Sequence, residues 1–195
     1  MAGHKRQWLV DSTAYTLAGG MASALVGALL GWLGAVLLPG QIGGLGLLAA
    51  IAVAALALAR ELGWLAVPLP QFRRQTRDVW GKVFPRTLAA AFWGIDVGLV
   101  FTTWLTFSGM WLLLVVVILV GEPGFGAALF VVHWFGRALS VWTAPWLLRD
   151  ARAIPGLVDW IAGQRRLFQR LHALGLTWAI IVLISWFAHG ASISN

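Results

Sequence analysis

Three ionisable side chains, Asp96, His133 and Arg137, lie deep within long apolar segments of the sequence. Such groups are costly in hydrocarbon, and they usually face a bundle interior or a water-filled cavity. At 1.5 Å per helical residue, Asp96 and Arg137 each lie about 15 Å from the basic end of their segment. Because a short turn joins the two segments, we expect an ion pair between Asp96 and Arg137, with His133 one turn from Arg137 on the same helix face.

The sequence leaves two interpretations of this group open. In the first, the pair only neutralises itself and sets the register of two helices. In the second, it belongs to a pathway for an ion, a proton or a substrate.

A cluster of hydroxyl groups in the same segment supplies the remaining transport or binding candidates. Thr102, Thr103 and Thr106 stand in the stretch GLVFTTWLTFSG. One straight helix over 87–120 would be about 50 Å long, whereas the hydrocarbon core of a bilayer is roughly 30 Å thick. Two outcomes are therefore open. The helix breaks near the cluster, where protein or water must satisfy the freed backbone groups, or it tilts strongly and the hydroxyls bond to the preceding turn.

The elements that position these groups are predicted to be transmembrane helices. The sequence is 60% hydrophobic and 11% charged, whereas a soluble domain is about a quarter charged. Its apolar stretches reach the roughly 20 residues that a helix needs to cross a bilayer. We expect an all-α, polytopic membrane protein that forms a single domain over 1–195. Five spans are predicted, at 14–38, 42–59, 87–120, 125–148 and 171–188.

The basic residues orient these spans. All of the 14 Lys and Arg residues except Arg137 lie on one side if the N-terminus is inside and the C-terminus outside. This agrees with the positive-inside rule and predicts a multi-pass protein of the inner (cytoplasmic) membrane. The basic segment 154–170 is predicted to be a helix on the cytoplasmic membrane surface, with an ordinary loop as the alternative, and 71–86 is predicted to be a loop.

Small residues mark one face of the first span. Ser23, Gly27 and Gly31 are spaced four apart, a spacing that lets two helix backbones approach closely in a membrane. We expect them to pack the bundle, and a ligand role is the alternative.

Several kinds of site are not predicted. The sequence has no cysteine, which excludes disulfides and thiolate metal sites. It shows no nucleotide loop, metal motif or catalytic triad, so no catalytic residue, metal or cofactor is predicted. Haem is not expected, because His133, His172 and His189 fall at different depths of their spans. The net charge of +7 comes from residues beside apolar segments, so the expected partner is the lipid bilayer and not nucleic acid. A second membrane protein or another copy of the chain is a further candidate partner.

Two glycine-punctuated stretches suggest a family. The segment AAAFWGIDVGLVFTTWLTFSGMWLLLVVVILVGEPGFGAALFVVHWFGRALSVWTAPWLL resembles the second half of the CcdA/DsbD-like transmembrane proteins, and TLAGGMASALVGALLGWLG resembles their early helices. The resemblance implies six helices in two inverted repeats that pass reducing equivalents across the membrane, for cytochrome c biogenesis and disulfide reduction. The family uses a cysteine in each of its first and fourth helices. Here we expect the first of these helices to be missing, and the second cysteine position falls near 102–105, where no cysteine stands. Thiol exchange needs a thiolate, so that activity does not carry over to this chain.

The function predicted from the sequence is therefore non-enzymatic. We expect small-solute or ion transport, or an accessory role in a membrane complex. The alternative is an electron-transfer component, with a thiol, quinone or haem relay, whose redox groups come from a partner or a cofactor. A pure scaffold subunit is the third option.

Overall fold

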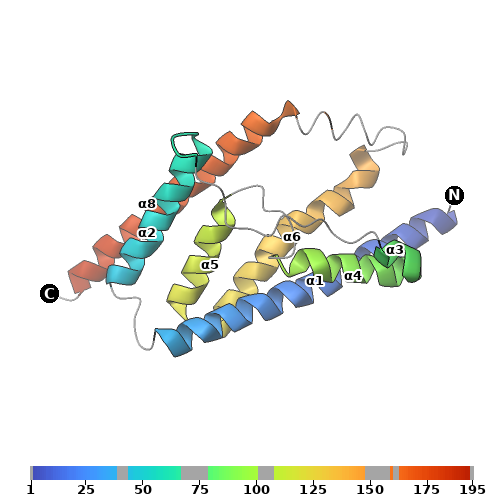
Figure 1. Cartoon of the computed structure of the whole chain (residues 1–195), viewed down its shortest axis with the longest axis horizontal. Helices are drawn as coiled ribbons and strands as arrows, with labels where there is room; N and C mark the ends of the chain where they lie inside the picture. Colours follow the sequence, from blue (N-terminus) through green and yellow to red (C-terminus); the bar gives the residue numbers. More distant parts are fainter. Residues whose placement is uncertain are drawn as a thin grey trace. The chain divides into compact units, whose positions relative to one another are not determined.

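The computed structural model describes residues 2–38, 44–66, 79–100, 108–147, 159 and 163–193. The described part contains seven helices and no strand (Figure 1). Their bounds are α1 Ala2–Leu37, α2 Gly44–Glu61, α3 Val79–Val83, α4 Arg86–Gly98, α5 Gly109–Val120, α6 Pro123–Leu147 and α8 Arg165–Ile193. The predicted all-α class is confirmed.

The chain divides into two compact units. The first unit contains 1–31, 70–105 and 123–149, and so most of α1 together with α3, α4 and α6. The second unit contains 32–69, 106–122 and 150–195, and so the end of α1 together with α2, α5 and α8.

Three of the described helices are long and apolar enough to cross a membrane. Their apolar parts are Lys5–Leu37, Pro123–Thr143 and Arg166–Trp186. They correspond to the first, fourth and fifth predicted spans. The helix α2, over the second predicted span, has 18 residues. Five crossings and their orientation stay predictions.

The predicted span 87–120 is not one continuous helix. It contains α4, of 13 residues, and α5, of 12 residues. At 1.5 Å per residue these helices are about 20 Å and 18 Å long, so neither alone covers a hydrocarbon core of roughly 30 Å. Val100 has a φ of 61°, a left-handed conformation that is strained for a β-branched residue. The break, one of the two predicted outcomes, is therefore present just after α4.

The predicted turn between α5 and α6 is confirmed. Gly121 adopts a left-handed conformation (φ 61°), and its N–H donates to the carbonyl of Val117 at 3.1 Å. Glycine takes this conformation without a Cβ penalty, which is why it commonly ends helices. Pro123 then begins α6, where its missing N–H costs no helical hydrogen bond.

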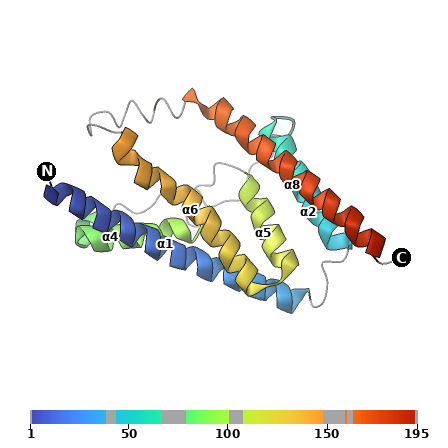
Figure 2. The same ribbon diagram turned by 180° about the vertical axis from the view of Figure 1, so that it is seen from behind.

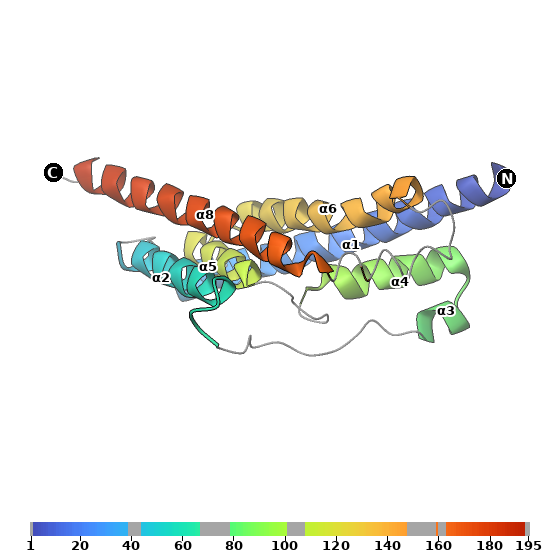
Figure 3. The same ribbon diagram turned by 90° about the horizontal axis from the view of Figure 1, so that it is seen from above.

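Two boundaries differ from the prediction. The segment 71–86 was predicted as a loop, but residues Val79–Val83 form the short helix α3, which lies beside α4 (Figure 3). Trp80 stacks on Phe92 of α4, with ring centroids 5.0 Å apart. This aromatic contact stabilises a helix too short to show a periodic pattern.

The second difference concerns the predicted surface helix at 154–170. Its last residues, from Arg165, belong to the 29-residue helix α8, because no Gly or Pro between 165 and 171 interrupts the chain. Residues 154–158 and 160–162 lie outside the described residues.

The core of the second unit lies among α2, α5 and α8. Figures 1 and 2 show α2 alongside α8 from opposite sides. The buried residues at their contact are Ala54, Ala57, Leu112 and Leu176. Two alanines on α2 let the neighbouring helices approach closely, as small residues do in membranes.

Candidate functional site

In the first unit, α1 and α4 touch backbone to backbone. A Cβ added at Gly94 would overlap the carbonyl oxygen of Tyr15, and one added at Gly98 would overlap that of Gly19. Only glycine allows this approach. The contact places the C-terminal half of α4, with its aspartate, directly against α1.

The predicted packing face of α1 is confirmed at two positions. A Cβ added at Gly27 would overlap the carbonyl oxygen of Gly126 on α6. Ser23 is fully buried, and its hydroxyl donates to the carbonyl oxygen of Gly98 at 2.8 Å. That carbonyl lies at the end of α4, where the helix no longer supplies a donor. Ser23 thus satisfies the last turn of α4 just before the break.

Two indole N–H groups of α6 donate hydrogen bonds to a single residue of α1, Thr16. Trp134 donates to the carbonyl oxygen of Thr16 at 2.8 Å, and Trp142 donates to its hydroxyl oxygen at 2.9 Å. The Thr16 hydroxyl donates in turn to the carbonyl oxygen of Ser12 at 2.7 Å. Buried tryptophans normally find such a partner for their N–H, so the polar atoms here hold helices together.

The structure brings the predicted site residues of α4 and α6 close together. Asp96 is buried, 9% exposed. The Nη1 atom of Arg137 lies 3.4 Å from the carbonyl oxygen of Val97, the next residue. Arg137 therefore reaches the last turn of α4, and a direct Asp96–Arg137 ion pair stays a prediction.

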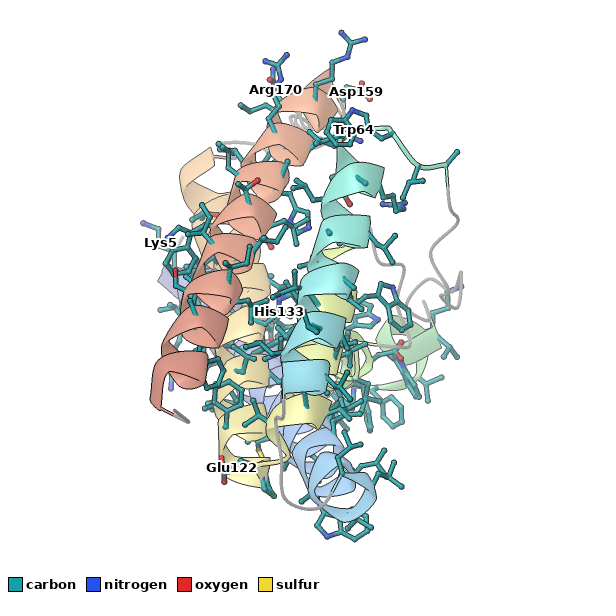
Figure 4. All side chains as sticks on the ribbon, turned by 90° about the vertical axis from the view of Figure 1, so that its left-hand side faces the viewer. Lys5, Trp64, Glu122, His133, Asp159 and Arg170 are labelled. Atoms are coloured by element: carbon teal, nitrogen blue, oxygen red, sulfur yellow. The ribbon has the colours of Figure 1, made fainter. Side chains whose placement is uncertain are left out.

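The other predicted site residues are placed as follows. His133 lies midway along α6, four residues before Arg137, and is half-buried (Figure 4). Thr102, Thr103 and Thr106 lie outside the described residues.

A polar cluster that the sequence did not predict lies in the second unit, at the start of α5. Glu61, at the end of α2, accepts hydrogen bonds at Oε1 from the hydroxyl of Ser108 at 2.6 Å and from its N–H at 3.0 Å. The next N–H, of Gly109, donates to Nε2 of His172 on α8 at 3.0 Å. Two of the backbone donors that a helix start leaves without a helical partner are thus satisfied by side chains of two other helices.

The electrostatics of this cluster favour its arrangement. A carboxylate beside a helix N-terminus interacts favourably with the partial positive charge there. Arg60 forms an ion pair with Glu61, at 3.0 Å between Nη1 and Oε1. Because Nε2 of His172 accepts a hydrogen bond, it carries no proton in this arrangement.

One sequence signal could have indicated the cluster. Glu61 is the only acidic residue between Asp11 and Asp78, and an isolated acid at the end of an apolar span requires a partner. The partner itself, a helix start about 47 residues later in the chain, has no local signal.

Neither the group around Asp96 and Arg137 nor the cluster of Glu61 and His172 has the composition of a metal site. Within the described ranges, no three His, Asp or Glu side chains lie close enough to hold a metal ion. The side chains that can be assigned a task satisfy backbone polar atoms at helix ends. Ser23 does so at the end of α4, and Glu61 with His172 at the start of α5.

Comparison with known proteins gives one informative similarity. Over 139 residues, 69% of this chain, the sequence is 30% identical to the methylamine utilization protein MauF of Paracoccus versutus. The match covers 49% of that protein, so the chain spans about half the length of the curated relative. No family model matches the sequence. No solved structure matches it either.

Proposed function

We propose that this chain is a multi-pass membrane protein with an accessory role in methylamine use. The observation that carries the proposal is the 139-residue similarity to a methylamine utilization protein. Helices long and apolar enough to cross a membrane support the membrane part of it. Because the chain spans about half of the relative's length, the proposal concerns the part that the two proteins share.

Growth of a deletion strain tests this role. A strain that lacks the chain is expected to grow normally on ammonium and poorly on methylamine as the nitrogen source, and the intact gene is expected to restore growth. Equal growth of deletion and parent strains on methylamine would rule out the proposed role. A defect on both nitrogen sources would instead indicate a general membrane function.

The proposal includes the inner membrane, five crossings and an N-terminus inside. The chain has no cysteine, so single cysteines can be introduced without background. We expect a membrane-impermeant maleimide to label the Glu122→Cys variant in intact spheroplasts and the Asp159→Cys variant only after lysis. Figure 4 shows both positions. Labelling of the two variants from the same side would refute an odd number of crossings between 122 and 159.

A second candidate function is small-solute or ion transport. It is supported by the buried Asp96 on α4 and by Arg137 of α6, which reaches the neighbouring carbonyl. Ionisable groups inside apolar helices commonly mark such pathways. Uptake of labelled methylammonium into vesicles that contain the purified chain tests it, with the Asp96→Asn variant as the control. Equal uptake by vesicles without protein would exclude transport of this solute.

The CcdA/DsbD-like family and its electron-transfer role remain a further proposal. A discontinuous third span, α4 followed by α5, is compatible with the resemblance. Any redox groups would have to come from a partner or a cofactor, since the chain has no thiol.

A further inference from the structure

A cavity of about 530 Å³ lies within the first unit, between the N-terminal part of α1 and the helices α3 and α4. Its wall contains three aromatic side chains, one acid and one base: Trp8, Tyr15, Trp93, Asp11 and Arg86. Cavities of 300 to 1,000 Å³ with an apolar wall and few polar groups are typical of small-molecule sites. The polar centre around Asp96 and Arg137 does not contribute to this wall.

Two of the aromatic walls are held by other aromatic rings. Trp8 packs edge-on against Trp142 of α6, with ring centroids 5.6 Å apart. Tyr15 packs against Trp134, also of α6, at 5.1 Å. These contacts limit the movement of Trp8 and Tyr15. Aromatic faces carry negative charge density and attract organic cations, and several aromatic side chains around one volume are typical of sites that bind ammonium ligands.

The acid in the wall is fixed in position. Oδ1 of Asp11 accepts hydrogen bonds from Nε2 of Gln7 at 2.8 Å and from the hydroxyl of Thr87 at 2.7 Å. Its side chain is 15% exposed. The carboxylate therefore holds one orientation at the edge of the cavity.

The base is bound only loosely to this acid. Nη2 of Arg86 lies 3.6 Å from Oδ2 of Asp11, and the Arg86 side chain is 77% exposed. That distance is too long for a hydrogen bond, and exposed pairs of this kind contribute little to stability. Another cation can therefore replace Arg86 beside Oδ2 at little cost.

We propose that this cavity binds an organic ammonium ion with an apolar body. The ammonium group lies at Oδ2 of Asp11, and the body lies against Trp8, Tyr15 and Trp93. An anionic lipid headgroup is the disfavoured occupant, because a phosphate at Arg86 would meet the fixed carboxylate of Asp11. The cavity is far larger than methylammonium, so the proposal goes beyond a role in methylamine use and does not depend on it.

Isothermal titration of the purified, full-length chain in detergent tests the proposal. The probes are 2-phenylethylammonium and the uncharged 2-phenylethanol, which has a similar shape. We expect saturable binding of the ammonium and at least about tenfold weaker binding of the alcohol. The alcohol lacks both the attraction of a cation to the aromatic rings and its attraction to the Asp11 carboxylate, and a desolvated cation–aromatic contact alone is enough for about a tenfold change in the dissociation constant.

Two variants distinguish the site from partition into detergent. Asp11→Asn keeps an acceptor for Gln7 and Thr87 but removes the charge, and it should weaken ammonium binding about tenfold. Gly81→Leu adds bulk beside Trp93, because a Cβ at Gly81 lies 3.4 Å from the indole ring, and it should abolish binding. The matched controls are Asp159→Asn, at an exposed acid, and Gly136→Leu, where an added Cβ meets no atom of another described element within 4 Å.

Three outcomes would overturn the proposal. The first is equal binding of the alcohol and the ammonium. The second is unchanged ammonium binding by Asp11→Asn or Gly81→Leu, with the helical circular dichroism of both variants intact. The third is displacement of the ammonium by phosphatidylglycerol, added as mixed micelles, if the Arg86→Gln variant loses that displacement. This result would assign the cavity to an anionic lipid.

Discussion

Replacement of Glu61 by alanine tests the account of how the start of α5 is stabilised. Ser108 is buried, 2% exposed, and both its N–H and its hydroxyl donate to the Glu61 carboxylate. After the substitution the hydroxyl can turn to the carbonyl oxygen of Ala57, 3.2 Å away, but the N–H is left without its acceptor. An unsatisfied buried donor costs about 1–3 kcal/mol, and loss of a negative charge at a helix N-terminus costs about 0.3–1 kcal/mol more. We therefore expect Glu61→Ala to lower the free energy of unfolding by about 1–4 kcal/mol.

The measurement is unfolding by SDS in mixed micelles, followed by far-UV circular dichroism. Asp159→Ala is the control, because Asp159 is an exposed acid, and we expect a change within about 0.5 kcal/mol there. Glu61→Gln should fall between the two variants, since the amide keeps an acceptor for Ser108 but loses the charge. If Glu61→Ala destabilised the protein no more than the control, the carboxylate would not be the partner that holds the start of α5. The double-mutant cycle with Ser108→Ala should show a coupling above about 0.5 kcal/mol.

Three further predictions follow from the first unit. Gly94→Ala should destabilise the chain by about 1–3 kcal/mol, because its methyl group meets the backbone of α1. Gly136→Ala should be neutral or stabilising by up to about 1 kcal/mol, because no neighbouring atom among the described residues lies within 4 Å of its added Cβ. The SDS midpoints of the two variants provide the check. The Asp96→Asn and Arg137→Gln variants should lose less stability together than the sum of their single losses, and strict additivity would exclude the predicted pair. Ser23→Ala should cost about 0.6 kcal/mol, the average for hydrogen bonds between membrane helices. A loss above about 3 kcal/mol in the same SDS assay would contradict the account of Ser23 as the donor of one neutral hydrogen bond.

The all-α class of the protein and the approximate positions of its long helices in the sequence follow from local properties of the chain. Whether a segment can cross a bilayer depends on its length and apolarity, which any window of the sequence shows. The spacing of Ser23 and Gly27 likewise predicts a close-packing face, and both residues make the expected contacts. The excess length of 87–120 predicted either a break or a tilt, but it could not decide between them, because both relieve the same mismatch.

Only the tertiary structure decided which partners the polar groups have. Ser108 and Gly109 start α5, but their acceptors come from α2 and α8, at Glu61 and His172. No periodic pattern predicts such a meeting, because a hydrogen bond depends on how each helix is rotated and shifted against its neighbours, to within a few tenths of an ångström. The aromatic cavity has the same origin: Trp8 and Trp93 lie on different helices, and only packing places them around one volume. The sequence by itself thus determined that the chain forms apolar helices with polar residues at intervals. The packing of those helices determined which polar groups find hydrogen-bond partners and where a cavity remains.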